Sequence, residues 1–151
     1  MSGEVFECEI QARFRDINLG GHVDNVEAIR VLDEARILFF RFADLGDGAP
    51  GLLAALPSGV AELAGSQRID YHAEMRFVPF APFQLRLWIS HLGRSSFTVS
   101  TELRVAADHP PAVVAQTTLV CWDHAAAASW PMDEAVRTRL SRFLGPPVPL
   151  R

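Results

Sequence analysis

The order in which two hydrophobic periods follow one another constrains the fold of this chain most. Apolar and polar residues alternate over about residues 6–14, as in a strand with one buried face. From Asp24 to about Ala43 the apolar residues recur with helical spacing. Period two then returns in four segments, residues 68–77, 83–92, 96–105 and 112–122. This order predicts an α+β fold in which an antiparallel sheet covers one long helix.

Short turn sequences separate the later strands and favour antiparallel neighbours. Residues 91–95 have the composition of a hairpin turn, and residues 108–111 end in two prolines that cannot donate to a ladder. A second, shorter helix is expected over about residues 131–143, and the proline-rich residues 145–149 are expected to form a stiff tail. Because no internal repeat interrupts this order, residues 1–151 are expected to form a single domain.

Composition limits the classes of function. The chain is 49% hydrophobic and carries a net charge of −4 with acids and bases interspersed, which argues against a nucleic-acid partner. The N-terminal residues do not form a secretion signal, and charges interrupt every apolar stretch before it reaches the length of a membrane span. A cytoplasmic protein without a membrane partner is therefore expected. Cys8 and Cys121 lack the spacing of metal ligands and are expected to be buried thiols, so no metal or cofactor is predicted.

The loop before the long helix carries most of the polar candidates for chemistry. It reads Asp16-Ile17-Asn18-Leu19-Gly20-Gly21-His22-Val23-Asp24-Asn25. A loop that opens a helix can direct backbone N–H groups at an anion or at a developing oxyanion, and here Asp24 and Asn25 begin the helix. Asp24 is the expected N-cap, with Glu27 completing a capping box.

Short motifs spread along the chain resemble those of one enzyme family. They are Arg13-Phe14-Arg15-Asp16, Gly21-His22-Val23-Asp24-Asn25, Glu34-Ala35-Arg36, Asp70-Tyr71 and Gly93-Arg94-Ser95-Ser96-Phe97. In order and over nearly the whole chain, they resemble the hotdog-fold acyl-CoA thioesterases of the 4-hydroxybenzoyl-CoA thioesterase type. The resemblance implies a sheet wrapped around a central helix, a homodimer or homotetramer, and hydrolysis of acyl-CoA or acyl-carrier-protein thioesters without a metal.

The chain departs from this family at three positions. Asn18 stands where the family usually has a catalytic Asp, Asp24-Asn25 replaces an Asn-Asn pair, and Ala28 replaces a tyrosine. An amide cannot accept a proton or attack as a carboxylate does. A branch that resembles the thioesterases of enediyne polyketide pathways also has Asn at this position, together with Arg at the position of Arg36. The resemblance therefore implies that Asn18 and Arg36 serve in place of the acid.

Helical geometry places Arg36 on the buried side of the helix. At 100° per residue it lies about 20° from Asn25, on the same arc as Ile29 and Leu32. A guanidinium in such a place needs a partner. Two interpretations stay open: an ion pair, with Asp33 or with an acid across a subunit interface, or a contact with substrate.

Other candidates also have two interpretations. Asp16 is either the missing acid, two residues early, or the partner of Arg13 or Arg15. Glu34 is either a replacement base or part of a solvated helix face. His22 either polarises a carbonyl and orients water, or is a hydrogen-bonded part of the loop. Arg94, Ser95 and Ser96 either hold the pantetheine or phosphates of CoA or form an exposed turn.

Hydrolysis of an acyl thioester is the function that these residues favour. The thioester oxygen would meet the first-turn N–H groups near Asp24 and Asn25, and Asn18 would position water or the acyl group. Arg36 or Asp16 would stabilise charge or assist proton transfer. The alternatives are a thioester-binding or scaffolding protein without hydrolysis, and a related hydratase or dehydratase. An open strand edge predicts at least a dimer, with sites at the subunit boundary.

Overall fold

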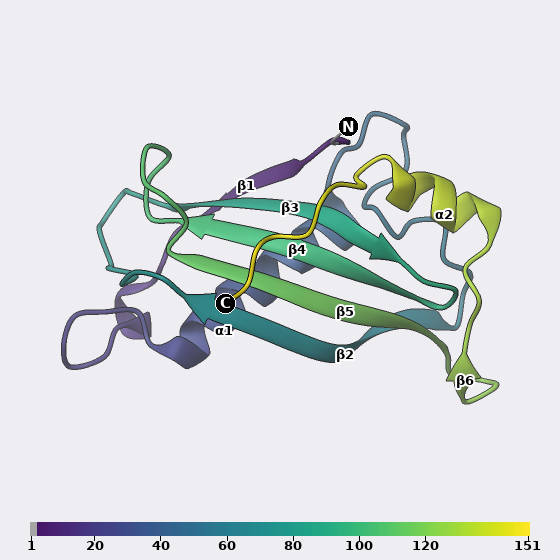
Figure 1. Cartoon of the computed structure of the whole chain (residues 1–151), viewed down its shortest axis with the longest axis horizontal. Helices are drawn as coiled ribbons and strands as arrows, with labels where there is room; N and C mark the ends of the chain where they lie inside the picture. The colour runs from purple at the N-terminus through teal and green to yellow at the C-terminus, as the bar shows by residue number, and fades with distance from the viewer. Residues whose placement is uncertain (1–2) are drawn as a thin grey trace.

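One antiparallel sheet and one long helix make up most of the molecule (Figure 1). The computed structural model describes residues 3–151. The sheet has the order β1-β3-β4-β5-β2, and a short β6 pairs with β5. The bounds are β1 (Phe6–Ile10), β2 (Val60–Tyr71), β3 (Phe83–Leu92), β4 (Ser96–Arg104), β5 (Val113–Asp123) and β6 (Ala128–Ser129). The predicted α+β arrangement is confirmed.

The long helix covers one face of the sheet, behind the strands in Figure 1. It consists of α1 (Asn25–Ile37), which continues as a π-helical turn, η2 (Leu38–Phe42), so its length agrees with the prediction. The core forms between it and the strands, and its largest fully buried side chains include Leu32, Phe39, Phe40, Phe83, Phe97 and Leu103. The predicted buried stripe is confirmed at Ala28, Leu32, Ala35 and Arg36, whereas Ile29 is 39% exposed.

The helix begins at the predicted N-cap, but the capping box does not form. The Asp24 Oδ1 accepts a hydrogen bond from the Val26 N–H at 2.9 Å. The Glu27 carboxylate turns instead toward Arg30, at 3.3 Å, and Arg13, at 3.5 Å. The Glu27 carboxylate therefore pairs with two guanidinium groups and not with the backbone N–H that the capping-box pattern predicts.

Two strands differ from their predicted bounds. The strand β2 ends at Tyr71 rather than 77, because Tyr71 pairs with Val113, the first residue of β5, and Pro110 and Pro111 stand just before it. It also starts earlier, at Val60, since a register shift between Ala64 and Ser66 interrupts the alternation that sequence reading relies on.

The first strand, β1, ends at Ile10 rather than near residue 14. The chain then forms a single 3-10 turn, η1 (Phe14–Asp16). The Arg13 N–H donates to Asp16 Oδ2 at 2.9 Å, so a side chain takes the donor that a continued strand would need.

The sheet face opposite α1 is called the outer face here, and the C-terminal residues cross it. After α2 (Glu134–Ser141), the segment 145–151 runs over β3, β4 and β5 toward β2, in front of the sheet in Figure 1. Val148 of this segment packs with Trp88 and Val114 in a small buried cluster of their own. None of the helices described over residues 3–151 has the length and the apolar composition of a membrane span.

Candidate active site

A hollow of about 350 Å³ opens beside the N-terminal end of α1. One wall is the loop before the helix, and the other is the segment that follows β2. The Val23 N–H donates to the Met75 carbonyl at 2.6 Å and joins the two walls. The lining residues are Asn18, His22, Val23, Asn25, Ala28 and Tyr71, His72, Ala73, Glu74 and Met75. Three of the predicted site residues, Asn18, His22 and Asn25, therefore lie together.

Asn18 holds the loop with its oxygen and keeps its amide nitrogen for other partners. Its Oδ1 accepts from the Gly20 N–H at 3.0 Å and from the His22 N–H at 3.3 Å. Because both partners are donors, the side-chain atom that faces them is the oxygen. The Nδ2 group lies outside these loop bonds, so Asn18 offers the hollow a hydrogen-bond donor and no base.

His22 forms a pair with a carboxylate across the hollow. Its Nε2 lies 3.1 Å from Glu74 Oε2, and Arg76 also reaches this oxygen, at 3.1 Å. In the neutral imidazole, the proton then resides on Nε2 and Nδ1 is free to accept one.

Glu74 is a site residue that sequence reasoning missed. In the alternation over residues 68–77 it occupies a polar position of a strand, like any surface acid. The chain leaves the ladder after Tyr71 and crosses to the loop, which brings Glu74 to His22. No local pattern signals this contact, since it depends on where β2 ends.

The first turn of α1 offers the hollow one backbone donor, the Asn25 N–H. The Val26 N–H is taken by the Asp24 side chain, and the Ala28 N–H donates to the Asp24 carbonyl. The Asn25 N–H lies outside both bonds, at the positive end of the helix dipole. Asp24 itself does not line the hollow and acts as the cap.

Asp16 lies outside this hollow, in a second one lined also by Glu27 and Glu34. Arg13 donates to both of its oxygens, with Nε at 3.1 Å from Oδ1 and the backbone N at 2.9 Å from Oδ2. Burial alone would raise the pKa of Asp16, but these bonds outweigh it and hold the pKa below its usual value. This geometry favours the ion-pair interpretation.

Arg36 of α1 is buried between the helix and the sheet, with 6% of its surface exposed. It donates to Gln67 Oε1 at 2.9 Å, to Thr117 Oγ1 at 3.3 Å and to Asp33 Oδ1 at 3.0 Å. Desolvation lowers its pKa, and Asp33 opposes this shift. At 1.5 Å per residue it lies about 16 Å along the helix from Asn25. Arg36 is therefore too far from the hollow of its own chain to take part in it.

The turn with Arg94, Ser95 and Ser96 lies at the opposite end of the sheet. Ser96 pairs with Val120 of β5, whereas Tyr71 pairs with Val113. The seven steps between them correspond to about 23 Å along the strand. Within one chain, these three residues do not meet Asn18.

Cys121 is buried as expected, whereas Cys8 is only partly buried. Burial raises the pKa of Cys8 and of Cys121 to about 11. Among residues 3–151, no group of three or more His, Cys, Asp and Glu side chains is placed to hold a metal ion.

The family model described as the thioesterase-like superfamily matches residues 12–140. The chain belongs to this superfamily. The match includes the loop, the long helix and every strand except β1, which ends before the match begins. No curated protein sequence matches the chain.

Solved structures of thioesterases have the same fold. A predicted thioesterase from Bacillus stearothermophilus is 16% identical, with a TM-score of 0.74 over 96% of this chain and 100% of that chain. A 1,4-dihydroxy-2-naphthoyl-CoA thioesterase from Synechocystis is 19% identical, with a TM-score of 0.73 over 91% and 96%. A thioesterase complexed with coenzyme A and Zn from Thermus thermophilus is 23% identical, with a TM-score of 0.68 over 91% and 98%. These likenesses show that this chain has the hotdog fold.

Proposed function

We propose that this member of the thioesterase-like superfamily hydrolyses an acyl thioester of CoA or of an acyl carrier protein. One observation carries the proposal: the hollow at the start of α1 combines hydrogen-bond donors with an imidazole–carboxylate pair. Donors suit the oxygen of a thioester, and the pair suits a water molecule. Structural neighbours crystallised with coenzyme A, from Thermus thermophilus and Staphylococcus aureus, support CoA as the thiol part.

The thioester oxygen faces the Asn25 N–H and the Asn18 amide. Attack at the carbonyl carbon places negative charge on this oxygen, and fixed donors at a helix N-terminus stabilise that charge more than the starting carbonyl. Loss of one such donor typically costs about 100-fold to 1,000-fold in rate. Asn18 then replaces the family's acid by stabilising charge rather than by accepting a proton.

The imidazole–carboxylate pair supplies the proton transfers. His22 Nδ1 accepts a proton from the attacking water while a bond forms between the water oxygen and the carbonyl carbon. Glu74 holds the other ring nitrogen and stabilises the imidazolium. When the carbon–sulfur bond breaks, this proton passes to the leaving thiolate, and the products are the free acid and the thiol.

Arg94, Ser95 and Ser96 serve the site of a second subunit in this proposal. If two β2 edges pair antiparallel, the strand directions reverse, and the partner's hairpin end lies at the same end of the joint sheet as this hollow. The partner's Arg94 then approaches the phosphates of CoA. Arg36, from its buried position, supports the wall between the two subunits rather than the reacting atoms.

Turnover and binding distinguish this function from a scaffold. Short, long and aromatic acyl-CoAs, and one acyl carrier protein, are incubated with the protein, and thiol release is followed beside calorimetric binding. Hydrolysis predicts release of one thiol per acid formed for at least one substrate. Binding with no thiol release by any of them would favour the scaffold and contradict the proposal.

The imidazole–carboxylate pair also favours a second candidate, a hydratase. The same His22 and Glu74 could move a proton at the carbon next to the thioester carbonyl. An enoyl-CoA substrate separates the two, because hydration consumes the double bond and leaves the thioester intact, whereas hydrolysis releases thiol.

A further inference from the structure

The C-terminal residues bind the outer face of the sheet along a row built for them. Trp88 of β3 is directly opposite Ser100 of β4, and Ser100 is directly opposite Gln116 of β5. All three project from the face that α1 does not cover. Residues 145–151, called the strap from here on, follow this row across the strands (Figure 1).

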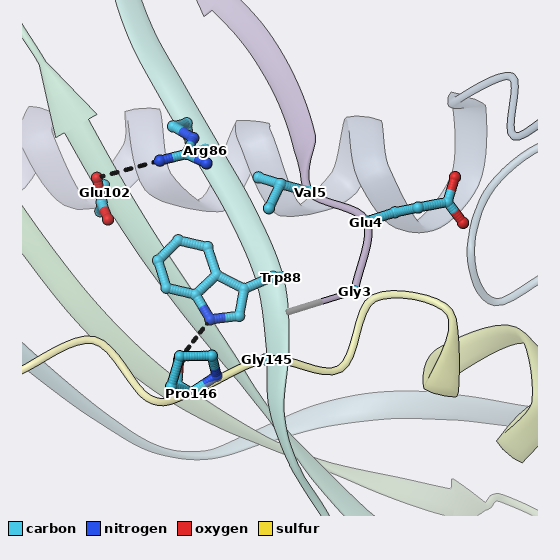
Figure 2. Close-up of a pocket in the computed structure, with 8 residues that line it drawn as sticks. All are labelled: Gly3, Glu4, Val5, Arg86, Trp88, Glu102, Gly145 and Pro146. Carbon is cyan, nitrogen blue, oxygen red and sulfur yellow. Dashed lines mark hydrogen bonds and ion pairs between the residues drawn. The ribbon is translucent and has the colours of Figure 1, made fainter. Parts of the chain in front are cut away.

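Every member of the row holds the strap by a hydrogen bond. The Trp88 indole N–H donates to the Pro146 carbonyl at 2.7 Å (Figure 2). Ser100 Oγ accepts from the Val148 N–H at 3.1 Å, and the Gln116 amide donates to the Val148 carbonyl at 2.9 Å. Three bonds from three neighbouring strands, with Val148 buried on Trp88, fix the path of the strap.

The strap ends against a wall of the candidate active site. The Arg151 N–H donates to Asp70 Oδ2 at 2.6 Å, and its guanidinium lies 3.4 Å from the Tyr71 carbonyl and 3.3 Å from His72 Nδ1. Tyr71 and His72 line the hollow that holds Asn18 and His22. The strap thus connects the outer face of the sheet to the site on the side of α1.

We propose that Arg151 is a positioning residue for the candidate active site and acts through His72 and Tyr71. The expected effect of Arg151 on turnover rests on the proposed function, whereas its effect on the His72 ring does not. A guanidinium only donates hydrogen bonds, so His72 Nδ1 is the acceptor and the ring proton lies on Nε2. Arg151 also contacts the main chain at the end of β2, where the ladder with β5 stops and the His72 and Ala73 N–H groups both turn to the Ala112 carbonyl.

Nitrogen NMR of the His72 ring tests the structural part without any substrate. The native chain is expected to show one dominant tautomer with the proton on Nε2, assigned by comparison with His72→Gln. In Arg151→Ala, the ring is expected to show the averaged signals of two tautomers, and Arg151→Lys is expected to restore the native pattern in part. Arg104→Ala, which removes an arginine of the same outer face that pairs with Glu102, is the control and should leave the signals unchanged.

Kinetics test the effect on the site. Arg151→Ala is expected to lower kcat/KM for an acyl-CoA by about tenfold, with the melting temperature unchanged, because a wall of the hollow loses its fixed position. If native protein shows no turnover, the proposed function fails while the NMR result still decides the role of Arg151. Native His72 signals in Arg151→Ala, or an equal change in Arg104→Ala, would overturn the inference.

Discussion

At the scale of single residues, Asn18 fixes the shape of the loop before α1. The loop needs an acceptor for the Gly20 and His22 N–H groups, which both a carboxylate and an amide provide. The amide adds a donor that a carboxylate lacks. Asn and Asp at this position would therefore hold the backbone in the same way but present different chemistry to the hollow.

Two variants of Asn18 separate these contributions. Asn18→Asp keeps the acceptor for both loop N–H groups and should retain the melting temperature, but thiol release should fall about tenfold or more because a charge replaces the donor. Asn18→Ala removes both the acceptor and the donor and should lower the melting temperature as well as the rate. Activity in Asn18→Asp equal to or above that of the native chain would show that the site still suits an acid.

Asp16 gives a prediction about pH. Its pKa is held below the ordinary value of about 3.9 by Arg13, so the folded chain binds this proton less readily than the unfolded chain. The stabilisation is present above about pH 4 and is lost as the pH falls through the folded-state pKa. The free energy of unfolding, measured with denaturant from pH 2 to 7, should fall less steeply toward low pH in Asp16→Asn than in the native chain. The same pH dependence in both chains would mean that the ion pair of Asp16 with Arg13 does not stabilise the fold.

At the scale of elements, Arg36 joins the long helix to the two strands that lie farthest from β1. Its partners Gln67 and Thr117 belong to β2 and β5, and Thr117 also donates to Gln67 at 2.9 Å. This network is what makes a guanidinium tolerable on a buried stripe. Its nearest acid, Asp33, has a side chain that is 64% exposed, so loss of Arg36 leaves no buried charge behind.

Arg36→Met is expected to lower the free energy of unfolding by about 1–3 kcal/mol, the cost of losing hydrogen bonds between a charged group and buried partners. Arg30→Met is the matched control on the exposed side of the same helix, where a change within about 0.5 kcal/mol is expected. Chemical denaturation measures both. Equal stability of the two variants would contradict the structural role of Arg36.

The sequence predicts the elements well where their signals are local. Residues 83–92, 96–105 and 112–122 are strands within one residue of their bounds, since alternation and turn residues mark both ends. The start of β2 is missed because the register shift at Ala64 and Ser66 breaks the alternation. Asn18, His22 and Asn25 are close in sequence, so their grouping could be predicted. Glu74 and His72 lie beside them only because β2 stops pairing with β5 at Tyr71, and no local sequence pattern indicates that position.

At the scale of the whole molecule, β2 presents the edge through which we expect copies to assemble. Within the described residues, this 12-residue strand pairs on one side with β5 and on its other side with no strand. A long open edge is a template for another strand. The chain is therefore expected to form a homodimer or homotetramer through β2, with the hollow near the boundary.

Light scattering at micromolar concentration checks this assembly. The native chain should have at least twice the monomer mass, and Leu63→Arg, which places a charge at a residue of β2 that is 44% exposed, should shift the equilibrium toward monomer. Arg104→Ala, on the outer face of β4, is the control and should leave the mass unchanged. A native monomer would rule out a site that needs the partner's Arg94.

Thiol release from an acyl-CoA by the native chain, beside Asn18→Ala and Glu74→Gln, tests the central claim most directly. Hydrolysis in the hollow predicts one thiol per acid in the native chain. It also predicts a rate at least about tenfold lower in each variant, with melting temperatures showing that both remain folded. Native rates in both folded variants would place the reaction elsewhere and contradict this account.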